Sequence, residues 1–98
     1  MESERIGAMI KARVLVFLKD DVMDPQGNAV ASALQSLGHS DLRRLRVGRC
    51  FDITLEGSDP EKARGSIDQM CRELLANTVV ERYEIHLTAD AAAGAWAS

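Results

Sequence analysis

The chain contains one structural pattern twice. In each half, a strand-like run leads to an Asp-Pro pair, a helix-like apolar stripe and a second strand-like run; the pairs are Asp24-Pro25 and Asp59-Pro60, 35 residues apart. Proline fits the first turn of a helix and aspartate caps its free N–H groups, so each pair marks a helix start. Right-handed crossovers place both helices of a βαββαβ chain on one side of its sheet. We therefore predict an α+β fold, a ferredoxin-like two-layer sandwich with a mostly antiparallel four-stranded sheet and both helices on one face.

The first half is predicted to hold one strand and one helix. Residues 12–19 are rich in β-branched and aromatic side chains, which favour a strand. The helix has two possible starts: Asp24 caps it directly, or residues 24–27 form a type I turn and Asn28 becomes the cap. Gly38 is predicted to end the helix, because glycine adopts the left-handed conformation without strain.

The middle of the chain is predicted to form a β-hairpin. In residues 41–47, apolar and polar residues alternate only toward the end, which places Arg44 and Arg46 on the outer face. In residues 51–56 they alternate throughout. Gly48-Arg49 between them suits a tight turn, since glycine supplies the positive φ that the turn needs. These two strands would form half of the predicted sheet.

The second half is predicted to end with a helix and a strand. The helix opens at Ser58, which has capping-box spacing to Glu61, or at Asp59. Asn77 is predicted to end this helix. Residues 79–87 then form the last strand.

Both ends of the chain lie outside the repeated pattern. Residues 1–10 show no clear period, and the alanine-rich residues 89–98 are low in complexity. We expect both to be frayed extensions of a single domain over residues 11–88.

Two apolar residues of the first strand are predicted to lie on the open face of the sheet. This strand is central in the predicted topology, and if residues 14, 16 and 18 face the helices, Leu15 and Phe17 point the other way. We predict that Leu15 and Phe17 are covered by another copy of the chain or by another protein. The alternative is two scattered apolar residues beneath charged neighbours.

Charge and composition argue against several classes of protein. The 98 residues include 12 Lys and Arg against 15 Asp and Glu, a net charge of −3. A nucleic-acid binder needs a basic footprint, so no nucleic acid is expected as a partner. No apolar run approaches the ~20 residues of a membrane helix, and the charged N-terminus does not resemble a secretory leader. We expect a cytoplasmic protein that binds no membrane.

The reactive residues form no catalytic pattern. Cys50 and Cys71 form no CxxC pair, and His39 and His86 lack metal-ligand spacing to either. Cys71 lies on an apolar helical stripe and is predicted to be a core residue. We identify no arrangement in the sequence that would make either histidine a general base. We expect no catalytic residue and no metal site in this chain.

One cluster of basic residues lies in this acidic chain: Arg43, Arg44, Arg46 and Arg49. Such a cluster could meet a phosphorylated ligand or an acidic partner surface. It could also be a solvated edge strand that discourages sheet extension. The sequence leaves these interpretations open.

Three segments carry a resemblance to a known family. They are Lys19-Asp20-Asp21-Val22-Met23-Asp24-Pro25-Gln26-Gly27, then Arg46-Val47-Gly48-Arg49, and Met70-Cys71-Arg72-Glu73-Leu74-Leu75-Ala76-Asn77. In this order they resemble the PurS family, the small subunit of bacterial and archaeal phosphoribosylformylglycinamidine synthase. The resemblance covers residues 12–87, nearly the whole predicted fold.

The resemblance implies a role in de novo purine biosynthesis. The assembled enzyme of this family uses ATP, Mg and glutamine to convert formylglycinamide ribonucleotide to formylglycinamidine ribonucleotide. A glutaminase subunit releases ammonia, and a large synthetase subunit activates the amide oxygen with ATP. By this resemblance the chain is a non-catalytic assembly subunit that brings the two together and could assist ammonia transfer. It binds no cofactor itself and forms a homodimer or tetramer.

The loops within the resembling segments are the expected contact surface for these partners. The alternative function is a βαββαβ small-molecule-binding regulatory module, because amino-acid-sensing domains share this element order. An acylphosphatase-like enzyme is less favoured, because Arg13 and Asn77 do not lie in the loop after the first strand, where an anion would bind. The predicted partner contacts are Lys19, Asp24, Pro25, Gly27, Gly48 and Arg49.

Overall fold

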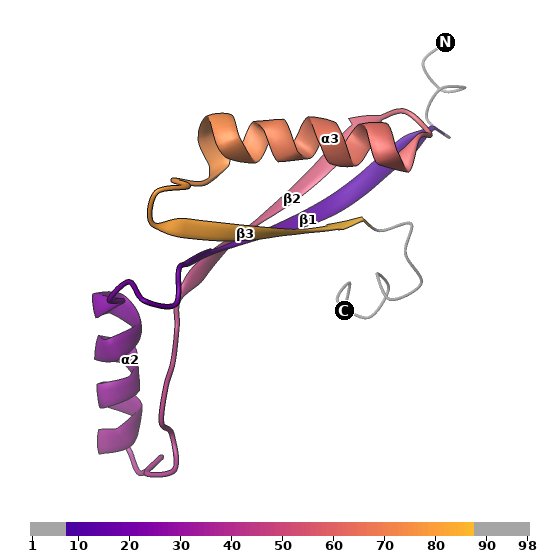
Figure 1. Ribbon diagram of the computed structural model, residues 1–98. Coiled ribbons are helices and arrows are strands. Elements are labelled where there is room, and N and C mark those ends of the chain that lie inside the picture. The colour runs from indigo at the N-terminus through magenta and orange to yellow at the C-terminus, as the bar shows by residue number, and fades with distance from the viewer. Residues whose placement is uncertain (1–7, 88–98) are drawn as a thin grey trace.

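The computed structural model describes residues 8–87. Figure 1 shows one helix, α3, lying along a sheet, whereas the other, α2, projects from one end of that sheet. We call residues 25–47 the arm, and the sheet together with α3 the body. In chain order the elements are β1 (Met9–Leu18), α2 (Pro25–Ser36), β2 (Gly48–Glu56), α3 (Pro60–Met70), a π-helical turn that continues α3 (Cys71–Leu75) and β3 (Glu81–Leu87).

β1 is the central strand of an antiparallel sheet with the order β2-β1-β3. Val14 pairs with Phe51 on one side and with Ile85 on the other, so these three apolar side chains share one face. α3 covers that face, and its Ile67 is fully buried there. The predicted α+β class is confirmed. The buried apolar core comprises Ile10, Ala12, Val14, Val16, Ala63, Ile67, Cys71, Ala76 and Leu87.

Both Asp-Pro pairs start helices, as predicted. Asp24 caps α2 and Asp59 caps α3, and each carboxylate accepts hydrogen bonds from backbone N–H groups of the first turn. The predicted capping box of Ser58 and Glu61 is therefore wrong, as is the alternative cap Asn28 of the first helix. Gly38, with φ of +111°, follows α2 in the left-handed conformation as predicted.

The predicted hairpin is wrong. Residues 41–47 form no strand, and Gly48 begins β2 opposite Phe17 instead of turning the chain. Gly48 also lacks the positive φ that a tight turn requires. Arg44 and Arg46 consequently lie outside the sheet, which has three strands within residues 8–87 instead of the predicted four.

α2 does not cover the sheet, so the prediction that both helices lie on one face is also wrong. The chain runs straight from the arm into β2, and this carries α2 beyond the end of the sheet (Figure 1). Gly27 is buried, but Val30 and Leu37 are 40% and 77% exposed. None of the helices within the described residues is long and apolar enough to cross a membrane.

Asn77 does not end the second helix in the left-handed conformation, contrary to the prediction. The helix continues as the π-helical turn and gives way to extended backbone at Ala76. Asn77 instead belongs to the loop that follows, where its side-chain oxygen accepts a hydrogen bond from Val79 N. β3 therefore begins at Glu81, two residues later than predicted.

The N-terminal boundary of the domain also differs from the prediction. β1 begins at Met9, and Ile10 is buried in the core, so two residues of the predicted extension over 1–10 belong to the sheet. Residues 1–7 and the predicted tail over 89–98 lie outside the described residues.

Candidate functional site

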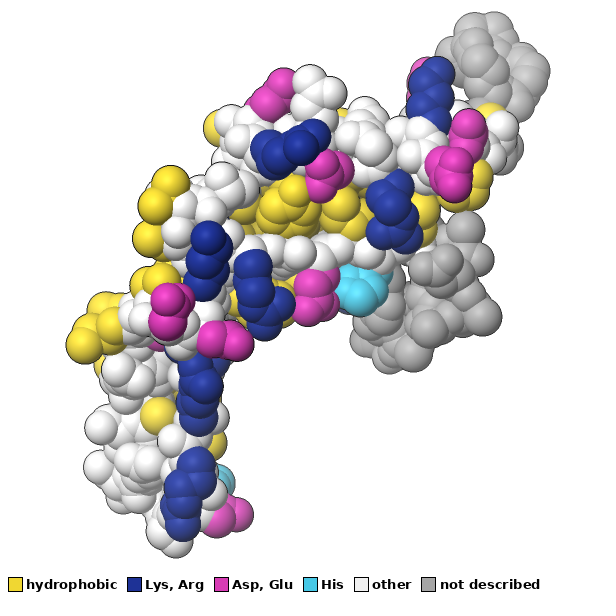
Figure 2. Space-filling view, viewed as in Figure 1, with side chains coloured by type: hydrophobic (Ala, Val, Ile, Leu, Met, Phe, Trp, Pro, Cys, Tyr) yellow, Lys and Arg dark blue, Asp and Glu magenta, His cyan; other side chains and the backbone are white. Residues whose placement is uncertain are grey.

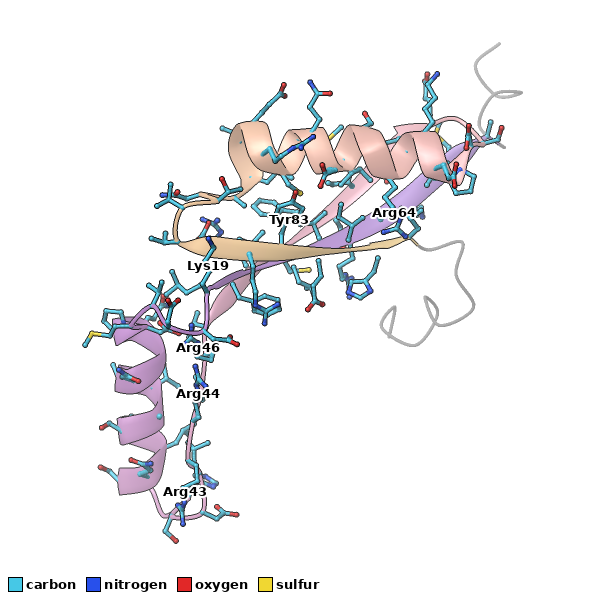
Figure 3. All side chains as sticks on the ribbon, viewed as in Figure 1. Lys19, Arg43, Arg44, Arg46, Arg64 and Tyr83 are labelled. Atoms are coloured by element: carbon cyan, nitrogen blue, oxygen red, sulfur yellow. The ribbon has the colours of Figure 1, made fainter. Side chains whose placement is uncertain are left out.

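The predicted partner contacts gather where the arm joins the body. We call this region, residues 18–27 and 46–49, the junction; Lys19 and Arg46 mark it in Figure 3. Lys19, Pro25 and Gly27 lie in its first segment, and Gly48 and Arg49 in its second. A recess of about 350 Å³ opens at the junction, lined by Val16, Leu18, Asp24, Gln26, Val47, Gly48, Arg49 and Glu81.

Asp24 ties α2 to the segment that returns from it. The residue is 5% exposed, and its Oδ1 accepts a hydrogen bond from Gly27 N while Oδ2 accepts one from Val47 N, each at 2.9 Å. These bonds, that of Gly27 first, hold the pKa of Asp24 below its ordinary value, and the positive charge of Arg46 adds to the effect. Asp24 is therefore a clamp at the junction as well as a helix cap.

The Asp24 clamp should weaken in acid. Because the pKa of Asp24 is lowered from 3.8 on folding, its stabilisation is present above that pH and is lost as the pH falls below it. Asp24→Asn has one acceptor oxygen for two backbone donors and should have a lower urea midpoint at neutral pH. We expect the difference from wild type to shrink between about pH 5 and pH 3. A difference that stays constant over this range would contradict the clamp.

Arg46 is a junction residue that the sequence analysis misplaced on a strand. Its Nη2 donates to Lys19 O at 2.9 Å and to Leu18 O at 3.1 Å. These carbonyls lie at the end of β1, just past its last pair with β2, so the guanidinium supplies donors where the β2 ladder has ended. The bonds link residues at least 27 apart in the chain. No local pattern signals such a contact.

Close backbone approach at the junction requires glycine at two positions. A Cβ on Gly27 would lie 2.5 Å from Asp24 Oδ2 and far inside contact distance of Leu45 O. A Cβ on Gly48 would lie 2.5 Å from Val16 O. Gly27 thus allows α2 to touch the returning segment, and Gly48 allows β2 to approach β1.

Arg49 binds the body and does not form a hairpin tip. Its Nη2 donates to Glu81 Oε1 at 2.8 Å and to Leu75 O at 3.0 Å. The same Glu81 oxygen accepts a hydrogen bond from Asn77 N. This network joins β2, the π-helical turn and β3. Its carboxylate belongs to Glu81, which is not among the predicted site residues. Partner contact by Arg49 stays a prediction.

Two groups that could carry out acid–base chemistry, Tyr83 and Cys71, are held inside the body. The Tyr83 hydroxyl donates to Asp68 Oδ1, and this bond, together with burial, raises the pKa of Tyr83. Cys71 lies in the core as predicted, where burial raises the pKa of its thiol and disfavours the thiolate. Within residues 8–87, no three His, Cys, Asp or Glu side chains gather as metal ligands.

Leu15 and Phe17 lie on the face of the sheet opposite α3, as predicted, and both are half-buried. The Arg82 guanidinium lies 4.6 Å from the centre of the Phe17 ring. Hydrogen bonds with His86 and Arg82 lower the pKa of Glu84 on the same face. The two apolar residues are thus bordered by exposed charged groups, and their role in self-association stays a prediction.

Comparison with known proteins finds relatives over almost all of the described chain. The family model of PurS, phosphoribosylformylglycinamidine (FGAM) synthase, matches residues 11–89. The phosphoribosylformylglycinamidine synthase subunit PurS of Synechocystis is 44% identical over 77 residues, which cover 79% of this chain and 77% of that protein.

Solved structures agree with this match. Bacillus subtilis PurS is 40% identical with a TM-score of 0.72, and the match covers 80% of this chain and 96% of that one. A chain in the structure of PurLQS from Thermotoga maritima is 30% identical with a TM-score of 0.75, covering 81% of this chain and 96% of that one.

Proposed function

The chain belongs to the PurS family of phosphoribosylformylglycinamidine synthase subunits, and from this membership we propose that it is the non-catalytic assembly subunit of that enzyme. The assembled enzyme is cytoplasmic and uses ATP, Mg and glutamine to convert formylglycinamide ribonucleotide to formylglycinamidine ribonucleotide. The chain brings the glutaminase and synthetase subunits together and binds none of these cofactors itself.

The main support for this proposal is that charged side chains at the junction bond other parts of the same chain. Asp24 ties the two ends of the arm to each other, Arg46 binds the arm to the end of β1, and Arg49 holds β2 to β3. Groups committed to fixing a shape are suited to presenting a surface, whereas a catalytic acid or base must reach a substrate. A relative within a structure of PurLQS supports a role in a larger assembly.

Complex mass tests the proposal. The purified chain is mixed with the glutaminase and synthetase subunits of its own organism, with and without glutamine and nucleotide, and the mass of each mixture is measured by light scattering. We expect one species that contains all three subunits in at least one condition. Three separate species under every condition would contradict an assembly role.

We also propose that the chain forms a homodimer or tetramer through the open face of the sheet. Leu15 and Phe17 lie on the central strand, where a second copy would bury them most completely. Exposed charged residues border them, as in an interface with an apolar centre and a polar rim.

Phe17→Asp should break this self-association. A carboxylate at the centre of an apolar contact would be buried without a matching partner. We therefore expect the dissociation constant of self-association to rise at least about tenfold. Analytical ultracentrifugation over a concentration series measures the change. The matched control is Ser66→Asp, an exposed position on α3 on the other side of the sheet. Equal masses for Phe17→Asp and wild type at every concentration would rule out this interface.

A further inference from the structure

The helix that covers the sheet ends in a turn that exposes a leucine. Ile67 and Cys71 are fully buried on the core side of α3 and of its π-helical continuation. Leu74 follows them by seven and by three residues, so a regular α-helix would bury it on the same side. In the π-helical turn, however, Ala76 N donates to Cys71 O at 2.9 Å. This longer turn rotates the chain so that Leu75 packs against the core and Leu74 is 84% exposed. Turns of this kind are rare and are frequent at functional sites.

Val79 is a second large apolar side chain that this end of the body exposes, at 78%. It lies in the loop between the π-helical turn and β3, and hydrogen bonds fix that loop. Val79 N donates to Asn77 Oδ1, and Glu81 N donates to Asn77 O. Lys19 N donates to Val80 O at 2.8 Å, which ties the loop to the end of β1. In Figure 2, uncovered yellow side chains lie at this end of the body. An exposed apolar surface on a fixed loop is suited to binding, because little chain entropy is lost when a partner covers it.

The charged groups around these two apolar side chains are mostly acidic. Three exposed carboxylates border them: Glu73, which precedes the exposed leucine, and Asp20 and Asp21, which follow the residue bonded to the loop. Within residues 8–87, none of the three forms an ion pair. Of the two cations beside them, Lys19 and Arg72, the second is balanced by Asp68 at 3.0 Å. The apolar surface therefore has an acidic border whose charge is left for another molecule to neutralise.

We propose that this surface, which we call the loop patch, docks a segment of a partner subunit that carries an apolar side chain flanked by lysine or arginine. The apolar side chain contacts Leu74 and Val79, and the basic groups meet the bordering carboxylates. A second copy of the chain is disfavoured as the occupant, because it would bring the same carboxylates together. This inference rests on the proposed function and deepens it, since it extends the expected contact surface from the junction onto the end of α3.

Truncation of the two apolar side chains tests the loop patch. Binding of the purified glutaminase and synthetase subunits to the full chain is titrated for wild type, Leu74→Ala/Val79→Ala and the control Ser66→Ala, an exposed position on α3. We expect the double variant to bind one partner at least about tenfold more weakly, because the apolar centre of the contact is lost. Its Tm should stay close to that of wild type, since both side chains are exposed. The control should bind as wild type does.

Charge reversal tests the acidic border separately. Glu73→Lys is compared with Glu61→Lys, which makes the same change at an exposed position in the first turn of α3. We expect Glu73→Lys to weaken binding of the same partner at least about tenfold at low salt, because like charges then face each other. Added salt should weaken wild type more than Glu73→Lys. Thermal melting checks the fold of each variant.

The outcomes separate this inference from the proposed function. If wild type assembles and Leu74→Ala/Val79→Ala binds both partners as tightly, the loop patch is wrong and the assembly role stands. If wild type binds neither partner, the proposed function fails and the inference fails with it. A double variant whose self-association changes while its partner binding does not would show that the loop patch meets a second copy, which also overturns the inference. Equal losses for Glu73→Lys and Glu61→Lys would show that the acidic border has no specific role in docking.

Discussion

Ile67→Ala is expected to lower the free energy of unfolding by about 3 kcal/mol, which corresponds to a fall of about 15 °C in Tm for a domain of this size. Ile67 is fully buried and packs in one cluster with Val14, Val16 and Cys71. Removing its outer carbons loses their transfer free energy and leaves a cavity between α3 and the sheet. Within residues 8–87 only α3 and its π-helical continuation cover this face of the sheet, because α2 projects away from it, so no other helix of that range could close over the gap. Urea titration at a fixed protein concentration measures the change.

Leu74→Ala provides the matched control for this prediction. Leu74 lies in the π-helical turn that continues α3 and is 84% exposed. An exposed leucine contributes little to the core, so we expect a change within about 0.5 kcal/mol. Equal losses for Ile67→Ala and Leu74→Ala would show that α3 does not form the core described above.

Gly27→Ala is expected to open the junction. The added Cβ would be pressed against Leu45 O and Asp24 Oδ2, and the first of these is a backbone atom that cannot rotate away. α2 or the returning segment must therefore shift, and the bonds from Gly27 N and Val47 N to Asp24 must lengthen or break. We expect a loss of about 2–3 kcal/mol in the free energy of unfolding. We also expect assembly with the partner subunits to weaken, since the arm loses its fixed direction.

Gly65→Ala separates this steric effect from the general effect of replacing glycine in a helix. Gly65 lies within α3, and nothing lies within 4 Å of the Cβ that alanine would add. Alanine favours helices over glycine, so this variant should be unchanged or more stable by up to about 1 kcal/mol. Hydrogen exchange of the Val47 amide, which donates to Asp24, then reports on the junction itself. If Gly27→Ala is as stable as Gly65→Ala and protects Val47 equally, the close contact at the junction is wrong.

The features that depend on local chemistry could be predicted from the sequence. Asp24 and Asp59 cap helices because each precedes proline and an apolar stripe, and Gly38 follows a helix that has no other stop signal. The alternation of β1 correctly placed Val14 toward the core and Phe17 on the opposite face. These assignments require only neighbours within a few residues.

The path of the chain between α2 and β2 could not be predicted in this way. Alternation over 41–47 followed by glycine fits a hairpin, and it fits equally well an extended segment that runs into a strand. Contacts between residues distant in sequence determine the path of the chain. They join Arg46 to the end of β1, Val47 to Asp24 and Gly48 to Val16. None of these pairs has a spacing that a local pattern could reveal.

Several residues of the junction could be predicted from the sequence, some of them for a reason that the structure contradicts. Asp24 and Gly27 lie at a helix entry, where the Asp-Pro pair predicts them. Gly48 and Arg49 form no hairpin tip, contrary to the prediction, yet the pairing of Gly48 with Phe17 brings them to the same junction. The basic cluster that includes Arg43 and Arg44 fits a ligand or partner surface as well as a solvated edge strand, and these two arginines lie in no strand.

Glutamine-dependent synthase activity of the reconstituted enzyme tests the central claim, that this chain supplies surface and no reacting group. The glutaminase and synthetase subunits are assayed together with ATP, Mg and formylglycinamide ribonucleotide, once with the chain and once without it, and the chain is assayed alone. We expect the chain alone to consume neither glutamine nor ATP, and the two other subunits to need it for glutamine-dependent turnover. Full glutamine-dependent turnover without the chain, or turnover by the chain alone, would contradict the claim.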